Sequence, residues 1–202
     1  REALKSGDQL WVAFQPLFGR REGEIIGAEA LVRWTHPRRG PISPANFVPI
    51  AESSGLIEQL GDFVLRRACH MGARWPGHTI AVNISPAQLR NPNFAERIFA
   101  ILEETGMRPQ DLEIEITESI LLDDEMAASD AIRTFRRAGI KIALDDFGTG
   151  YSSLNYLKRY PVDRIKIDRS FISQLSTAGA ASAIVQALVT LAHALGIEVA
   201  AA

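Results

Sequence analysis

The sequence is poor in the residues that would place it in several common classes of protein. Cys69 is its only cysteine, so no disulfide can form within the chain, and a reduced, cytoplasmic setting is expected. A core position in a helix is expected for this cysteine. The chain also lacks an excess of one charge, since 22 lysines and arginines balance 24 aspartates and glutamates to a formal net charge of -2. This near balance argues against a broad surface for DNA, RNA or a membrane.

Long apolar runs are missing as well. The most apolar region, residues 181–202, is interrupted by polar residues and by Gly196, which predicts a helix, a turn and a strand rather than a membrane span. The basic pairs Arg38-Arg39 and Arg136-Arg137 are short and are interpreted as solvated surface. The chain starts at Arg1 rather than Met, so we expect a domain of a larger protein.

What the chain does contain is enough apolar material for one core. Hydrophobic residues make up 47% of its 202 residues, and no linker or low-complexity tract divides them. Residues 1–202 are therefore interpreted as a single domain.

Short β-branched runs alternate with longer amphipathic stretches. The predicted strands are residues 11–18, 25–34, 79–85, 112–117, 140–147, 164–168 and 197–201. The predicted helices include residues 56–74, 94–105, 127–138 and 180–195. Residues 19–24 form a connection short enough for an antiparallel hairpin between the first two strands. The remaining alternation predicts a parallel sheet flanked by helices.

An open doubly wound sheet and a β/α barrel both fit this alternation. The side-chain pattern of the strands separates the two. In residues 112–117, Glu113, Glu115 and Thr117 oppose an aliphatic face, and residues 79–85, 140–147 and 164–168 show a similar division. A doubly wound sheet needs apolar residues on both faces, whereas a barrel can open into a polar site where its strands end. The pattern therefore favours a barrel.

Asp145 and Asp146 are the most informative pair of residues. They end an apolar run and precede Phe147-Gly148-Thr149-Gly150. Two adjacent carboxylates at the end of a buried strand repel each other and lose hydration, and a divalent metal ion between them offsets both costs. The alternative for this segment alone is a solvated turn with two surface aspartates.

Further polar residues share the inward side of the strands near their ends. They are Glu29, Asn83, Glu115, Asp145, Lys166 and Asp168. An all-oxygen ligand set without histidine or cysteine favours Mg²⁺ or Mn²⁺ over zinc or copper. Lys166 and Arg33 supply positive charge for a phosphate-bearing substrate. Taken singly, each acid can instead be a salt-bridge partner, and Lys166 can pair with Asp168 or Asp145.

Several motifs follow one another along the chain. They are Gln15-Pro16, Glu29-Ala30-Leu31-Val32-Arg33-Trp34, Gly40-Pro41-Ile42-Ser43-Pro44, Val82-Asn83-Ile84-Ser85, Glu115-Ile116-Thr117-Glu118, the segment Asp145 to Leu154, and the segment Lys166 to Phe171. In this order they resemble the motifs of the EAL-domain family, the bacterial cyclic di-GMP phosphodiesterases. The resemblance implies a modified TIM-type (β/α)₈ barrel with an antiparallel first strand. It also implies hydrolysis of cyclic di-GMP to linear pGpG with two Mg²⁺ or Mn²⁺ ions.

The resemblance also implies a role for each matching residue. The implied metal ligands are Glu29, Asn83, Glu115 and Asp145, with Asp146 serving the second metal. The implied catalytic residues are Lys166, which orients or polarises the attacking water, together with Glu29 and Asp146. The implied substrate contacts are Gln15, Leu31, Arg33 and Asp168. Glu118 resembles the residue that steadies the loop of residues 145–150.

The C-terminal end departs from the family pattern. Ala202 stands where the family has a glutamate of the metal site, and the family's last β/α unit lies beyond the sequence given. We expect this chain to be weakly active or inactive and a longer chain to regain activity.

The main hypothesis is a metal-dependent cyclic di-GMP phosphodiesterase domain in bacterial second-messenger signalling. The expected partner is cyclic di-GMP. The domain is expected to form a homodimer and to bind neither a nucleic-acid polymer nor a membrane directly. The alternatives are an effector that binds cyclic di-GMP without cleaving it and a regulatory dimerisation domain.

Overall fold

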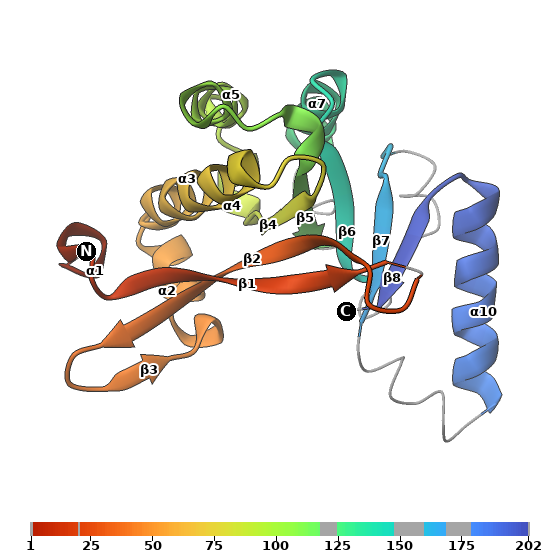
Figure 1. Ribbon diagram of the computed structural model, residues 1–202, viewed down its shortest axis with the longest axis horizontal. Helices are drawn as coiled ribbons and strands as arrows, with labels where there is room; N and C mark the ends of the chain where they lie inside the picture. Colours follow the sequence, from red (N-terminus) through yellow and green to blue (C-terminus); the bar gives the residue numbers. More distant parts are fainter. Residues whose placement is uncertain (1, 20, 118–124, 148–159, 169–178, 202) are drawn as a thin grey trace. The chain divides into compact units, whose positions relative to one another are not determined.

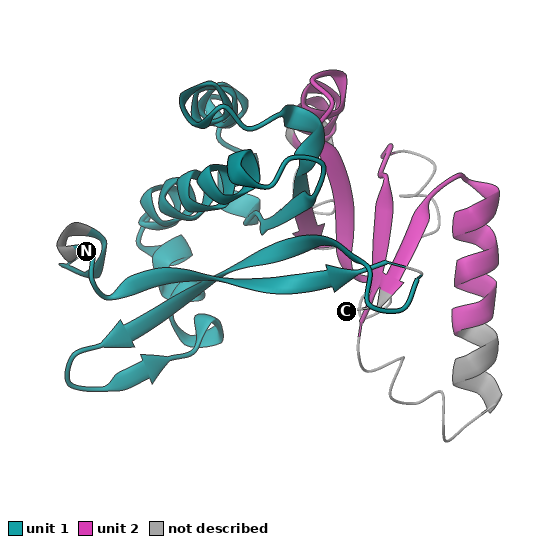
Figure 2. Ribbon diagram, viewed as in Figure 1, with its two compact units in different colours: residues 1–114 teal, residues 115–202 magenta. Residues whose placement is uncertain are grey.

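The computed structural model describes residues 2–19, 21–117, 125–147, 160–168 and 179–201 (Figure 1). They belong to an α/β structure with two compact units, unit 1 with residues 1–114 and unit 2 with residues 115–202 (Figure 2). Each unit has its own strands and helices. The interpretation of the whole chain as one domain stays a prediction.

A long antiparallel hairpin opens the sheet of unit 1. β1 (Leu10–Phe18) pairs with β2 (Ile25–His36), which confirms the hairpin predicted from the short connection. β3 (Gly40–Ile42) adds a short antiparallel strand at the end of β2, and β4 (Thr79–Asn83) pairs with β2 in parallel. β2 and β4 approach so closely at Gly27 that a Cβ there would overlap the carbonyl oxygen of Thr79. Glycine is therefore needed at this position.

The helices of unit 1 are α1 (Glu2–Ser6), α2 (Pro44–Ser53), α3 (Ile57–Arg74), α4 (Pro86–Leu89) and α5 (Phe94–Thr105), followed by the short 3₁₀ helix η1 (Pro109–Asp111). The three longest, α2, α3 and α5, bury one apolar stripe each. In α3 the buried residues Leu60, Val64 and Ala68 recur every fourth position, as one helix face requires. α5 ends at Gly106, whose φ of 71° is the left-handed conformation expected of a C-terminal glycine.

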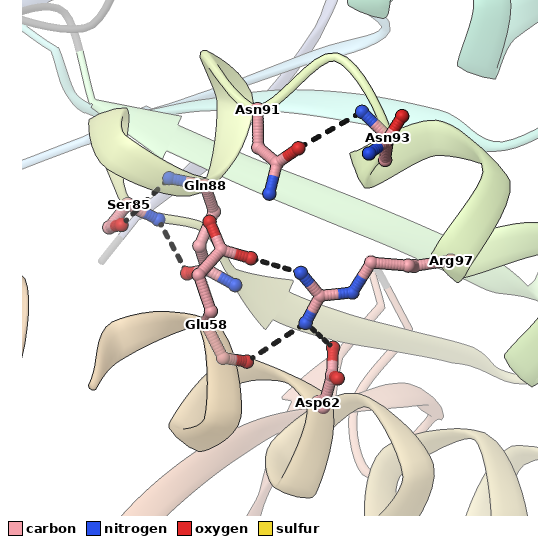
Figure 3. A network of polar contacts seen from close by, with 7 residues as sticks. All are labelled: Glu58, Asp62, Ser85, Gln88, Asn91, Asn93 and Arg97. Carbon is pink, nitrogen blue, oxygen red and sulfur yellow. Dashed lines mark hydrogen bonds and ion pairs between the residues drawn. The ribbon is translucent and has the colours of Figure 1, made fainter. Parts of the chain in front are cut away.

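Two groups of polar contacts hold these helices (Figure 3): ion pairs join α5 to α3, and a capping box starts α4. Arg97 of α5 forms ion pairs with Glu58 and with Asp62 of α3, the latter at 2.5 Å. Burial alone would lower the pKa of Arg97, but its hydrogen bonds and charge pairing with Asp62 and Glu58 outweigh burial and raise that pKa. At the start of α4, the Gln88 backbone N–H donates to Ser85 Oγ at 3.3 Å, and the Ser85 backbone N–H donates to Gln88 Oε1 at 3.2 Å. This reciprocal capping box holds both side chains in place.

Unit 2 contains parallel strands, and a described helix precedes two of them. β6 (Lys141–Phe147), β7 (Arg164–Ile167) and β8 (Glu198–Ala201) pair in this order, and α7 (Glu125–Arg137) and α10 (Gly179–Ala194) precede β6 and β8. β5 (Leu112–Thr117) spans the boundary between the units. Ile142, Leu144 and Ile165 are buried, as predicted for the aliphatic face.

The predicted strands and helices agree with the observed ones to within two residues at most ends. α1, α2, β3 and η1 were not predicted from the sequence. α2 carries Pro44 at its first turn and Pro49 inside, which obscures its helical pattern. Cys69 is confirmed as a buried residue of α3, and burial raises the pKa of its thiol from 9.0 to about 12. Among the described residues, no helix is both long and apolar enough to cross a membrane.

Candidate active site

In unit 1, a carboxylate of β2 meets an amide at the end of the neighbouring parallel strand β4. Asn83, the last residue of β4, donates a hydrogen bond from Nδ2 to Glu29 Oε1 of β2 at 2.7 Å. Parallel pairing places Glu29 opposite Ala81, and Asn83 is two residues further along β4. The side chains of Glu29 and Asn83 therefore leave the same side of the sheet. Glu29 is half-buried and Asn83 is exposed. The pair offers oxygen atoms to solvent on the side of the sheet predicted from strand parity.

Three of the four predicted substrate contacts lie on this same side of the β1–β2 hairpin. The register pairs Gln15 with Glu29 and Ala13 with Leu31, and it pairs Trp11 with Arg33. Because successive side chains alternate between faces, residues 11, 13 and 15 of β1 share the face of residues 29, 31 and 33 of β2. Arg33 donates from Nη1 to the carbonyl oxygen of its neighbour Val32 at 3.0 Å. The predicted residues Gln15, Leu31 and Arg33 are thus brought to one face with Glu29.

Trp11 is a further residue of this face that the sequence analysis missed. Its side chain is 50% exposed, and its indole N–H donates to Thr35 Oγ1 at 3.3 Å. Side-chain alternation puts Glu29 and Arg33 on one face. Extending the same alternation to the paired strand β1 could have identified Trp11. An exposed indole beside an arginine can stack on a planar ring.

In unit 2, one lysine holds two acidic side chains. Lys166 Nζ of β7 lies 2.8 Å from Glu115 Oε1 of β5 and 3.2 Å from Asp145 Oδ2 of β6. The Glu115 side chain is 0% exposed, that of Lys166 7% and that of Asp145 14%. These three groups carry a net charge of -1 when ionised. Isolated buried charges are costly, so a cluster of this kind must be held by mutual attraction or by a bound cation.

The backbone is irregular at the end of β6, where the paired aspartates stand. The register of β6 on β7 shifts between Leu144 and Phe147, and Asp146 has a φ of 54°. The Asp146 backbone N–H donates to Asp145 Oδ1 at 3.0 Å. A left-handed aspartate costs about 1–2 kcal/mol relative to an extended one, and such strained positions cluster at functional sites. This bulge lets one strand end present two neighbouring carboxylates, one half-buried and one exposed.

The remaining predicted residues fall outside this cluster or outside the described part of the chain. Asp168 follows β7 directly and is half-buried, two residues beyond Lys166. Glu118, most of the loop that follows Phe147, and position 202 lie outside the described residues. Lys166 pairs with Asp145, which was one of the two pairings considered from the sequence.

Comparison with known proteins places the chain in a family. The family model described as EAL domain matches residues 1–202. An uncharacterized signaling protein of Caulobacter vibrioides is 49% identical over 96% of this chain. The cyclic di-GMP phosphodiesterase NbdA of Pseudomonas aeruginosa is 38% identical over the whole chain. These matches cover 24% and 26% of the two relatives, so the chain spans about a quarter of their length.

A solved structure gives the same result for the fold. The MucR phosphodiesterase in complex with cyclic di-GMP superposes with a TM-score of 0.92 at 38% sequence identity, covering 99% of this chain and 83% of that one. The chain belongs to the EAL-domain family. The predicted α/β barrel class with an antiparallel first strand is thereby confirmed.

Proposed function

We propose that this chain is a metal-dependent phosphodiesterase domain that hydrolyses cyclic di-GMP to linear pGpG in bacterial signalling. The observation that carries the proposal is the buried Glu115–Lys166–Asp145 cluster in a chain of the EAL-domain family. Support comes from relatives that share this family and are named as cyclic di-GMP phosphodiesterases. In the overall reaction, water adds to phosphorus, the bond to the 3′ oxygen breaks, and a 5′-phosphate and a 3′-hydroxyl result.

The donor set fits two Mg²⁺ or Mn²⁺ ions. The proposed ligands are Glu29, Asn83, Glu115, Asp145 and Asp146, which offer only carboxylate and amide oxygens. Such hard oxygen donors suit these two cations better than zinc or copper. When bound, ions of this kind lower the pKa of water and neutralise phosphate charge. The Asn83 side chain orients the Glu29 carboxylate through the hydrogen bond between them, which fixes one ligand atom in direction.

Each remaining residue has a proposed task of its own. Lys166 is held by Glu115 and Asp145, so its ammonium has a fixed position from which to donate a hydrogen bond to the attacking water or to the phosphate. Arg33 and Gln15 lie on the face of Glu29 and would bind the nucleotide, with Leu31 as an apolar contact. Asp168 and Glu118 are proposed as a substrate contact and a loop-steadying residue. A cytoplasmic location and a homodimer are proposed as well.

Because weak or no activity is expected of this chain alone, the test is to incubate both it and a chain extended past residue 202 with cyclic di-GMP and Mg²⁺ or Mn²⁺, and to follow pGpG by chromatography. Glu29→Gln keeps the size of the side chain but removes its charge, so turnover should fall by about 100-fold or more. The matched control is Glu22→Gln, an exposed glutamate in the β1–β2 turn, which should leave turnover unchanged. Far-ultraviolet circular dichroism shows whether each variant is folded.

Two other outcomes would change the assignment. Tight binding of cyclic di-GMP without turnover by either chain would indicate the binding effector instead of the enzyme. If neither binding nor turnover is detected, both assignments fail and the regulatory domain remains. Equal turnover by Glu29→Gln and the unmodified chain would remove Glu29 from the catalytic residues.

A further inference from the structure

Unit 2 has a depression at the start of β6, at the opposite end of that strand from Asp145 and Asp146. Its volume is about 450 Å³, within the range of small-molecule sites. The end of α7, the turn before β6 and the segment before β7 form its walls. The lining residues are Arg133, Arg136, Arg137, Gly139, Ile140, Lys141, Pro161 and Asp163.

The charge of this depression is strongly positive. Three arginines and one lysine line it against a single carboxylate, that of Asp163, so the lining carries a net charge of +3. The chain as a whole has a formal net charge of -2, so a general excess of basic residues does not explain the cluster. The C-terminus of α7 adds a partial charge of about -0.5, which three guanidinium groups far outweigh.

The one carboxylate in the depression is already engaged. Asp163 Oδ1 accepts a hydrogen bond from Arg136 Nη2 at 2.8 Å, and its Oδ2 accepts one from the Ile142 backbone N–H at 2.9 Å. Asp163 thereby fixes Arg136 and joins the start of β6 to the segment before β7. It is not available to neutralise the other two arginines.

Arg133 and Arg137 stand one helical turn apart on α7 and are both exposed. Within the described part of the chain, neither makes an ion pair or a hydrogen bond with its side chain. Like charges spaced by four residues destabilise a helix slightly. The helix dipole favours Arg136 and Arg137 in the last turn but gives no reason for Arg133 a turn earlier. Two exposed guanidinium groups therefore stand beside the depression, where they can bind an anion.

We propose that this depression is a binding site for a small phosphate-bearing anion, separate from the proposed catalytic residues. Guanidinium groups bind phosphate oxygens in pairs through parallel N–H donors, and Arg133 and Arg137 present two such groups beside the fixed Arg136. Lys141, half-buried at the start of β6, adds a fourth cation. The small volume of this open depression and its few cations suit a diphosphate or nucleotide rather than a nucleic-acid polymer.

The experiment is isothermal titration calorimetry of the chain with inorganic pyrophosphate in EDTA, which keeps divalent metals from taking part. We expect saturable binding that weakens with added salt. Arg133→Gln and Arg137→Gln should each weaken it by about tenfold or more, because each removes a charged hydrogen-bond donor. The control is Arg21→Gln, an exposed arginine of unit 1, which should bind pyrophosphate like the unmodified chain.

Several results would overturn the proposal. They are the absence of pyrophosphate binding at millimolar concentration, equal binding by the Arg133→Gln/Arg137→Gln double variant, and binding of a polyglutamate peptide in place of pyrophosphate. A parallel titration with ADP shows whether the site binds a nucleotide or only its phosphates. Tighter binding of ADP than of pyrophosphate assigns a nucleotide, and equal binding assigns recognition of the phosphates alone. Because the double variant leaves Glu29 and Lys166 intact, its cyclic di-GMP turnover tests the catalytic proposal independently.

Discussion

Lys166 is the residue that balances the charge of the unit 2 cluster. Its ammonium contacts one fully buried carboxylate, that of Glu115, and one largely buried carboxylate, that of Asp145. Removing one partner of a buried ion pair leaves an uncompensated charge and costs about 3–5 kcal/mol. We therefore expect Lys166→Met to lower the free energy of unfolding by that amount, as measured by urea denaturation in EDTA.

The same substitution also tests the metal assignment. In Lys166→Met, added Mn²⁺ should recover part of the lost stability because a cation among the carboxylates replaces the ammonium charge. The double variant Lys166→Met/Glu115→Gln is the control, since it removes both charges of the shorter pair and should lose less stability than Lys166→Met alone. A loss below about 1 kcal/mol in Lys166→Met would show that the ion pair contributes little.

One glycine of α3 allows the close contact between α3 and α4. A Cβ on Gly61 would overlap Nε2 of Gln88, whose Oε1 is held by the Ser85 backbone N–H in the capping box of α4. Alanine favours a helix interior over glycine by about 1 kcal/mol, but overpacking a filled site costs about 1–3 kcal/mol. We expect Gly61→Ala to destabilise the chain by about 1 kcal/mol, because the buried Gln88 side chain must leave its cap. Thermal or urea unfolding measures this change.

A double-mutant cycle gives the sharper result for this contact. In a Gln88→Ala background the obstacle is gone, so Gly61→Ala should become neutral or stabilising through its helix propensity. If Gly61→Ala has the same effect in both backgrounds, the close approach of α3 to the Gln88 side chain does not determine the stability.

β6 shows at the scale of one element what the sequence could predict. Its apolar alternation and its terminal aspartates predicted a strand that ends in a polar site, and both features are observed. The positive φ of Asp146 and the shifted register were not predictable, because they depend on how β6 pairs with β7. Arg136 is exposed, as interpreted from the sequence, but its partner was not predictable. Its ion pair with Asp163 joins residues 27 positions apart, and local patterns carry no information on such contacts.

Over the whole molecule, local patterning gave the fold class and ordered motifs gave the family. The short connection before β2 predicted the antiparallel hairpin, and strand parity placed Glu29 and Asn83 on one side of the sheet. α2 escaped prediction because its prolines mask the helical period, and β3 because three residues are too few for a pattern. Element type thus follows from sequence periodicity, whereas the partners of each charged side chain follow from tertiary packing.

The charge balance of the whole chain predicts how it associates in solution. The sequence has an isoelectric point near 6.1, and large apolar side chains are exposed, among them Phe18 and Ile50 at 65% each. Near this pH the mutual repulsion between molecules vanishes, so contacts between exposed apolar groups are opposed least. Above its isoelectric point the chain becomes negative, and at pH 7 its formal net charge is -2. Light scattering at low salt should therefore show the strongest association near pH 6 and a steady decline toward pH 8.

Added salt should raise the scattering at pH 8 toward the value at pH 6, because it screens the repulsion. Scattering that does not change with pH would assign any association to a fixed apolar contact instead, and Phe18→Ser and Ile50→Ser would then identify which exposed side chain makes it.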